Sequence, residues 1–236
     1  GKVTVPEGKY IVSSLFLKSN VELHLEEKAE LIAVHNYQTY VETFYPDVLG
    51  PYASTSIVYA PAMLFAENAT NIKLTGKGTL NGIGDDPAFP HANNRKGRPR
   101  LISFLNCREV LVENVTLRSS AAWVQHYLLC DGVTIRGIKV FSFSNYNNDG
   151  IDIDSRNVLI ENCYIESDDD GICLKSDLPI VCENVTVKNC EIRSNCNAIK
   201  LGTSSYGGFR NIRISDCRIQ AATQSPIYNW SETYPW

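Results

Sequence analysis

A unit of two short apolar runs, repeated along the chain, constrains the fold more than any other feature. Five copies occur, namely VLVENVTL (110–117), VTIRGIKV (133–140), VLIENCYI (158–165), VTVKNCEI (185–192) and IRISDCRI (212–219). Their starts are 23, 25, 27 and 27 residues apart, and weaker copies begin at Val21 and Ile72. Such a period is typical of solenoids, in which each repeat buries its apolar face against its neighbours. The sequence therefore predicts one solenoid domain over residues 1–236.

The runs within each unit predict strands. Apolar residues alternate with polar ones, as in Val158, Ile160, Cys163 and Ile165, which is the period of a half-buried strand. Leucine-rich repeats have a similar length, but this chain lacks their regular leucines and a helical convex side. We therefore expect an all-β, right-handed parallel β-helix of about 23–27 residues per coil and about seven coils.

Stacked coils place equivalent residues in columns. One column lies at the kink between the two runs, where Asn tolerates a left-handed backbone; it contains Asn114, Gly137, Asn162, Asn189 and Asp216. Cys163, Cys190 and Cys217 follow it directly. Metal ligands would converge on a point instead of following an axis, so we interpret these cysteines as small core residues.

Two insertions interrupt the coils, at residues 35–60 and 84–100, and both have the composition of loops. The first is rich in tyrosine, so it suits a wall that binds sugar rings. The chain ends in SPIYNWSETYPW without a recognisable cap, which suggests truncation at one or both ends.

Composition excludes some partners. The net charge of −4 leaves no basic surface for nucleic acid, and no apolar run is long enough to span a membrane. We expect a monomer. The eight cysteines do not decide the compartment.

Three carboxylates come together when the third segment of each coil is aligned. These segments read YNNDGIDID (146–154), SDDDGICLK (167–175) and NCNAIKLGT (195–203). Matching their isoleucines, Ile151, Ile172 and Ile199, places Asp149, Asp170 and Asn197 in one column, with Asn148, Asp169 and Cys196 beside it. Adjacent coils are about 4.8 Å apart. Asp149, Asp169 and Asp170 are therefore expected to crowd together.

This crowding favours chemistry over a structural role. Like charges at close range push their pKa values apart, which gives one site both a carboxylic acid and a carboxylate. That pair is the equipment for glycosidic bond hydrolysis. The structural alternative is a polar turn, because Asp-Asp-Gly and Asn-Asp-Gly are strong turn formers. The alignment across two coils favours the functional site.

At these residues the chain resembles the polygalacturonase-like glycoside hydrolases of family 28, which are right-handed parallel β-helices. The resemblance runs from KVTVPEGKYIV through WVQHYLLCDGVTIRGIKV to RNVLIENCYI. The family's Asn-Thr-Asp-Gly is similar to Asn147–Gly150, and its Asp-Asp to Asp169-Asp170. The resemblance implies that Asp169 is the general acid and that Asp149 and Asp170 activate water, with inversion. It implies no cofactor or metal, and we expect a secreted or periplasmic enzyme.

Two family motifs differ here. Gly-His-Gly falls on Cys196-Asn197-Ala198, and the uronate-binding Arg-Ile-Lys falls on Pro226-Ile227-Tyr228. These differences call a polygalacturonate substrate into question. The expected ligand is a pectic or related acidic polysaccharide or oligosaccharide, and the expected substrate-binding residues are His126, Asn147, Asp152, Lys175, Asn197 and Lys200.

Two other functions use the same scaffold. In a polysaccharide lyase, Asp168, Asp169 and Asp170 would hold Ca²⁺ and Lys175 would lie near the base. In a carbohydrate-binding or adhesive β-helix the carboxylates would be vestigial. A pure binder gains nothing from holding three acids within one coil spacing, so hydrolysis is the preferred interpretation.

Overall fold

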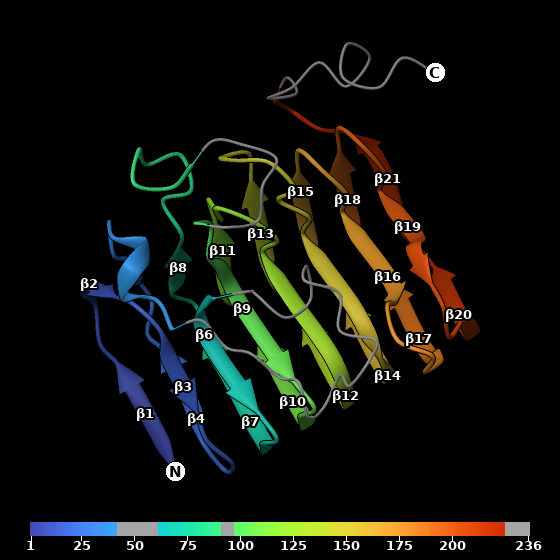
Figure 1. The fold of residues 1–236 in the computed structure, drawn as a ribbon, viewed down its shortest axis with the longest axis horizontal. Coiled ribbons are helices and arrows are strands. Elements are labelled where there is room, and N and C mark those ends of the chain that lie inside the picture. Colours follow the sequence, from blue (N-terminus) through green and yellow to red (C-terminus); the bar gives the residue numbers. More distant parts are fainter. Residues whose placement is uncertain (42–60, 91–96, 225–236) are drawn as a thin grey trace.

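In the computed structural model, the chain forms a stack of coils that advances steadily from the N-terminus to the C-terminus (Figure 1). The structure describes residues 1–41, 61–90 and 97–224. All strand pairs are parallel. The predicted right-handed parallel β-helix is confirmed.

Three columns of strands run along the stack. The first consists of β1 (Lys2–Val5), β4 (Glu22–Leu25), β7 (Thr70–Gly76), β10 (Arg108–Glu113), the second halves of β12 (Gln125–Arg136) and β14 (Ile151–Glu161), β17 (Cys182–Lys188) and β20 (Phe209–Ser215). The second is an eight-stranded sheet of β2 (Gly8–Val12), β5 (Ala29–Ala33), β8 (Thr79–Asn81), β11 (Thr116–Arg118), β13 (Lys139–Ser142), β15 (Tyr164–Ser167), β18 (Glu191–Ser194) and β21 (Arg218–Ala221).

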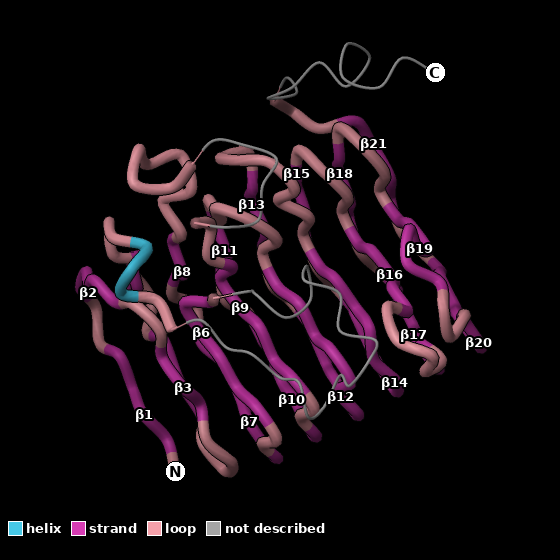
Figure 2. The backbone as a smooth tube through the Cα atoms, viewed as in Figure 1, coloured by secondary structure: helices cyan, strands magenta, loops and turns pink. Residues whose placement is uncertain are grey.

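The third column carries the functional residues. It consists of β3 (Leu15–Leu17), β6 (Ala62–Glu67), β9 (Arg100–Leu105), the first halves of β12 and β14, β16 (Ile172–Ser176) and β19 (Ile199–Ser205). The two long strands β12 and β14 bend between columns, so the first and third columns form one hydrogen-bonded sheet. A short 3₁₀ helix (Tyr37–Thr39), cyan in Figure 2, is the one helix in the described part of the chain.

Apolar side chains stack coil upon coil to form the core. In the first column Ile72, Val110, Val133, Val158 and Val185 are in register and buried. Fully burying one such side chain is worth about 1.5–3 kcal/mol. The alternation read from the sequence therefore places one branched side chain per coil into a continuous core.

The predicted columns are also present. The backbone of the kink column is left-handed in each of these coils. The φ angle lies between 52° and 63° at Asn114, Asn162, Asn189 and Asp216, and it is 64° at Gly137. The predicted cysteine column is buried at Cys163 and Cys190 and half-buried at Cys217. All eight cysteines are free thiols.

The loop boundaries need one correction. The insertion expected at 84–100 ends earlier, because Arg100 is the first residue of β9 and its side chain is buried. Of the insertion expected at 35–60, residues 42–60 lie outside the described residues, as do Pro226, Ile227 and Tyr228. The repeats found within the sequence did not include the first coil, β1 to β3.

Candidate active site

Backbone hydrogen bonds fix the register of the three segments that carry the acids. Ile151 pairs with Ile172, and Ile172 pairs with Ile199, as predicted. The Gly150 N–H donates to the Asp170 carbonyl and the Gly171 N–H to the Asn197 carbonyl, both at 2.8 Å. Asp149, Asp170 and Asn197 therefore lie on successive coils, each just before a strand of the third column.

Glycine follows each acid because the next coil passes close by. A Cβ on Gly150 would lie 2.6 Å from the Gly171 carbonyl oxygen, and one on Gly171 would lie 2.7 Å from the Ala198 carbonyl oxygen. Neither glycine has a left-handed backbone. The Asp-Gly pairs are therefore a close-packing device, and the turn interpretation does not account for them.

The three acids line one cavity of about 160 Å³. The described residues of its wall are Trp123, Asn147, Asp149, Asp169, Asp170, Lys175, Asp177, Lys200, Thr203 and Ser204. Three larger grooves lie along the described part of the stack and contain none of the three acids. The cavity is small because it lies among side chains of adjacent coils.

Asp169 accepts a hydrogen bond on each of its carboxyl oxygens. The Asn147 amide donates to its Oδ2 at 3.2 Å, and the Asp170 N–H donates to its Oδ1 at 2.8 Å. The Asp169 N–H in turn donates to Asn148 Oδ1. Burial first, and then the neighbouring Asp170, raise the pKa of Asp169. A raised pKa suits a general acid.

Asp170 has cationic and amide partners on both oxygens. Lys200 donates to Oδ2 at 2.8 Å, and the Asn197 amide donates to Oδ1 at 2.7 Å. Burial opposes the charge of Lys200, but the hydrogen bond to Asp170, the charge of Asp170 and the nearby Cys173 together outweigh it and raise the Lys200 pKa. Charge-assisted hydrogen bonds of this kind favour the ionised carboxylate. Asp170 thus has a hydrogen-bond donor on each carboxyl oxygen, next to Asp169.

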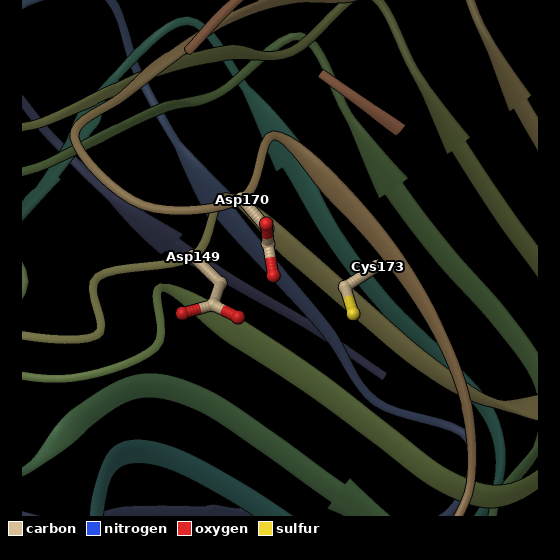
Figure 3. A group of neighbouring side chains, drawn as sticks. All are labelled: Asp149, Asp170 and Cys173. Atoms are coloured by element: carbon tan, nitrogen blue, oxygen red, sulfur yellow. The ribbon is translucent and has the colours of Figure 1, made fainter. Parts of the chain in front are cut away.

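Asp149 has a different environment from Asp170, although the two lie one coil apart (Figure 3). Among the described residues, Asp149 Oδ1 accepts no hydrogen bond and the side chain is buried. Oδ2 lies 3.9 Å from the Lys175 ammonium. Burial first, then Asp152 and Asp169, raise the pKa of Asp149 well above its usual range.

The site residues expected from the sequence fall into two groups. Asn147, Lys175 and Lys200 line the cavity with the three acids, and Asn197 contacts it through Asp170. His126 and Asp152 are buried behind the wall. Arg100 Nη1 lies 2.8 Å from His126 Nδ1, and this buried contact holds the histidine ring in place.

Sequence reasoning missed an aromatic residue at the floor of the cavity. Trp123 is buried, with the Arg100 guanidinium 4.2 Å and the Lys175 ammonium 4.5 Å from its ring centroid. The Val124 N–H donates to the Asp149 carbonyl at 2.8 Å, which ties the tryptophan beside it in the sequence to the coil that carries Asp149. Its place beside His126, one coil before Asp149, is the sequence signal that could have identified it.

The cluster in Figure 3 also has the composition of a cation site. Asp149, Asp170 and Cys173 offer ligand atoms within 4.8 Å of one another. However, Lys200 and Asn197 already engage both oxygens of Asp170, and Lys175 Nζ lies 3.2 Å from the Cys173 sulfur. These side chains therefore have positively charged or amide partners within the protein.

Comparison with known proteins agrees with this geometry. The sequence profile of glycosyl hydrolases family 28 matches residues 2–225. The chain belongs to this family. It is 30% identical over 177 residues to a probable polygalacturonase of Vitis vinifera, covering 73% of this chain and 36% of the relative. It is 23% identical over 221 residues to an exo-poly-alpha-D-galacturonosidase of Dickeya chrysanthemi, covering 72% and 36%.

A solved structure shows the same fold. The hyperthermoactive exopolygalacturonase of Thermotoga maritima aligns with a TM-score of 0.74 at 24% identity, over 92% of this chain and 58% of the other. The chain spans about a third of the length of the two curated relatives. No helix in the described ranges is long and apolar enough to cross a membrane.

Proposed function

We propose that this family 28 protein hydrolyses glycosidic bonds of a pectic or related acidic polysaccharide or oligosaccharide by an inverting, two-carboxylate mechanism. The observation that carries the proposal is the stacking of Asp149, Asp169 and Asp170 on adjacent coils around one cavity. The family membership and the polygalacturonase names of the relatives support the same substrate class. We also propose a secreted or periplasmic location, where such polymers are met.

The contacts of each acid support a division of roles. By the match to family 28, Asp169 would donate its proton to the oxygen of the leaving sugar, and its pKa is raised, as a general acid needs. Asp149 and Asp170 would hold a water molecule, and its proton would pass to Asp149. The bond from the anomeric carbon to the leaving oxygen breaks as the bond to water forms. Attack from the face opposite the leaving group inverts the anomeric configuration.

A panel of pectic oligosaccharides tests the proposal. New reducing ends should appear with wild type and be lost in Asp169→Asn, while the variant still binds the same oligosaccharide in a titration. Binding without any product from the wild type would instead indicate a carbohydrate-binding protein.

A lyase is the second candidate, because Asp149, Asp170 and Cys173 come within ligand distance of one another. Eliminative cleavage leaves an unsaturated product that absorbs in the ultraviolet, and a chelator would abolish a Ca²⁺-dependent reaction. Hydrolysis gives reducing ends without that absorbance. Chelator-sensitive ultraviolet absorbance would therefore overturn the assignment.

A further inference from the structure

Lys175 lies inside the site with two acids beside it. Its side chain is only 9% exposed, and its ammonium lies 3.1 Å from Asp152 Oδ1 and 3.9 Å from Asp149 Oδ2. The ammonium also lies over the Trp123 ring, at 4.5 Å from its centroid. These contacts hold the Lys175 ammonium between Asp149, which lines the cavity, and Asp152, which does not.

Asp152 depends on this lysine. The Asp152 carboxyl group has no solvent exposure, and in the described part of the chain the ion pair with Lys175 is its only direct partner. Its neighbours along the third column are His126 on β12 and Cys173 on β16. If Lys175 turned away to bind a sugar carboxylate, Asp152 would remain buried without a counterion, which is costly. The geometry therefore disfavours a direct substrate contact for Lys175.

We propose that Lys175, which lies between Asp149 and Asp152, is a positioning residue whose charge favours the ionised form of Asp149, the base for the attacking water. This inference rests on the proposed hydrolytic function. It assigns to Lys175 a role toward Asp149 that differs from binding the substrate. In the reaction the proton of the attacking water goes to Asp149 and the proton of Asp169 goes to the leaving oxygen. Lys175 exchanges no proton and acts through its charge.

The charges around Asp149 explain why a cation is needed. Asp152 on β14 and Asp169 and Asp170 before β16 all raise the pKa of Asp149, after burial, and Lys175 is the group that lowers it. The other charged or titratable groups act at the edge of this cluster. Arg100 on β9 faces Asp152 and lies beside His126, Lys200 on β19 faces Asp170, and the Cys173 thiol lies beside Lys175.

Burial also opposes the charge of Lys175 itself. Asp152 first, and then Asp149 and Cys173, more than compensate and hold the Lys175 pKa well above its usual value. The Asp152 pKa is raised to about 6, mainly by burial, with Lys175 acting against the rise. Asp152 and Lys175 thus stabilise each other's charged form, and Asp149 feels the net effect of the pair.

Opposite changes at the two ends of the ion pair test the inference. In Lys175→Met, the acid limb of the pH profile of kcat/KM should move to higher pH by about one unit or more, because Asp149 loses the one cation that lies close to it among the described residues. In Asp152→Asn, the same limb should move to lower pH, because Asp149 loses a like charge and keeps the lysine. Lys139→Met, an exposed lysine on β13, is the matched control and should leave the limb in place.

Each result has a distinct meaning. Reduced activity in both variants, with the acid limb of the kcat/KM profile at its wild-type pH, would overturn the inference and leave the hydrolase assignment intact. A raised KM with unchanged kcat and limb in Lys175→Met would assign that lysine to substrate binding instead. Absence of product from the wild type would overturn the proposed function itself.

A second measurement does not depend on catalysis or on the folding of Lys175→Met. The titration of Asp149 can be followed by carboxyl ¹³C NMR in the wild type and in Asp152→Asn. The inference predicts a lower midpoint in Asp152→Asn. An unchanged or higher midpoint would contradict it.

Discussion

Two columns of polar residues run along the same stack of coils, and their contrast separates folding from function. At the kink column, Asn162 and Asn189 are exposed and neutral, with φ of 56° and 52°. At the acid column, Asp149 and Asp170 are buried and their neighbours add further carboxylates. Stacking equivalent residues on adjacent coils costs little free energy when the residues are neutral and adopt the left-handed backbone of the kink. Stacking acids carries an electrostatic cost that folding does not require.

The kink column satisfies the backbone directly. The Asn162 N–H donates to the Lys188 carbonyl and the Asn189 N–H to the Ser215 carbonyl, both at 3.2 Å. The acid column shows the same repeating backbone bonds but adds charges that need Lys175 and Lys200 as counterions. The kink column therefore supports folding. The acid column carries an electrostatic cost that reduces the stability of the fold.

The largest effect is expected at the acid column. Asp169→Asn should lower kcat by about 10³-fold or more, because general acid catalysis is worth about 10²–10⁴-fold. Its free energy of unfolding at pH 7 should be unchanged or higher, because a buried carboxyl with a raised pKa has been removed. Steady-state kinetics and urea unfolding check the two parts. Turnover equal to that of the wild type would refute the assignment of Asp169.

A smaller effect is expected at Asp154, a buried acid of β14 that lies outside the cavity wall. Burial raises its pKa to about 7, against the hydrogen bond from the Asp177 N–H, and the charge of Asp177 adds to the rise. The folded state therefore binds more protons than the unfolded state between about pH 4 and pH 7, so this group's contribution to stability falls as pH rises through that window. Asp154→Asn should raise the free energy of unfolding above pH 7 by about 4 kcal/mol and leave it unchanged near pH 4.

Asp131 provides a control of opposite sign. The Asn157 hydrogen bond first, and then Arg156, lower the pKa of Asp131. Its contribution to stability is present above about pH 4 and is lost as pH falls. Asp131→Asn should thus lower stability at pH 7. The same sign of change in both variants would show that burial does not set the Asp154 pKa.

The smallest effect is expected at the kink column. Asn162→Ala should lower the free energy of unfolding by about 1 kcal/mol, because a left-handed backbone is unfavourable for alanine, whereas Asn162→Gly should be close to neutral. Both variants should keep the kcat of the wild type. Urea unfolding measures the first difference, and equal stabilities for the two variants would show that φ at this position carries no cost.

The sequence predicted those features of the fold and site that depend on the repeat itself. Matching Ile151, Ile172 and Ile199 was enough to place Asp149 and Asp170 on adjacent coils, because parallel pairing repeats with the period of the sequence. The first coil was missed although no insertion separates it from the second, since Lys2 pairs with Glu22 only 20 residues on. The insertion separates the second coil from the third. Residues paired between β4 and β7, such as Glu22 and Lys73, are 51 apart in the chain.

Contacts between insertions and coils could not be predicted in this way. Arg100 was assigned to a loop because the end of the insertion has no periodic pattern, yet β9 begins there and brings Arg100 onto Trp123. The partners of lysines were also hidden, because strand register fixes the position of Cα and not the direction of a long side chain. The contacts of Lys200 with Asp170 and of Lys175 with Asp152 could therefore not be foreseen, and the expected substrate-binding role of both lysines stays a prediction.

The anomeric configuration of the first product tests the central claim most directly. The wild type is mixed with a pectic oligosaccharide that it cleaves, and ¹H NMR records the anomeric signals before mutarotation equilibrates them. Water held by Asp149 and Asp170 attacks opposite the leaving group, so the inverted anomer should appear first, and Asp169→Asn should give neither anomer above background. First formation of the retained anomer would contradict this, because it requires a covalent intermediate on one of the acids.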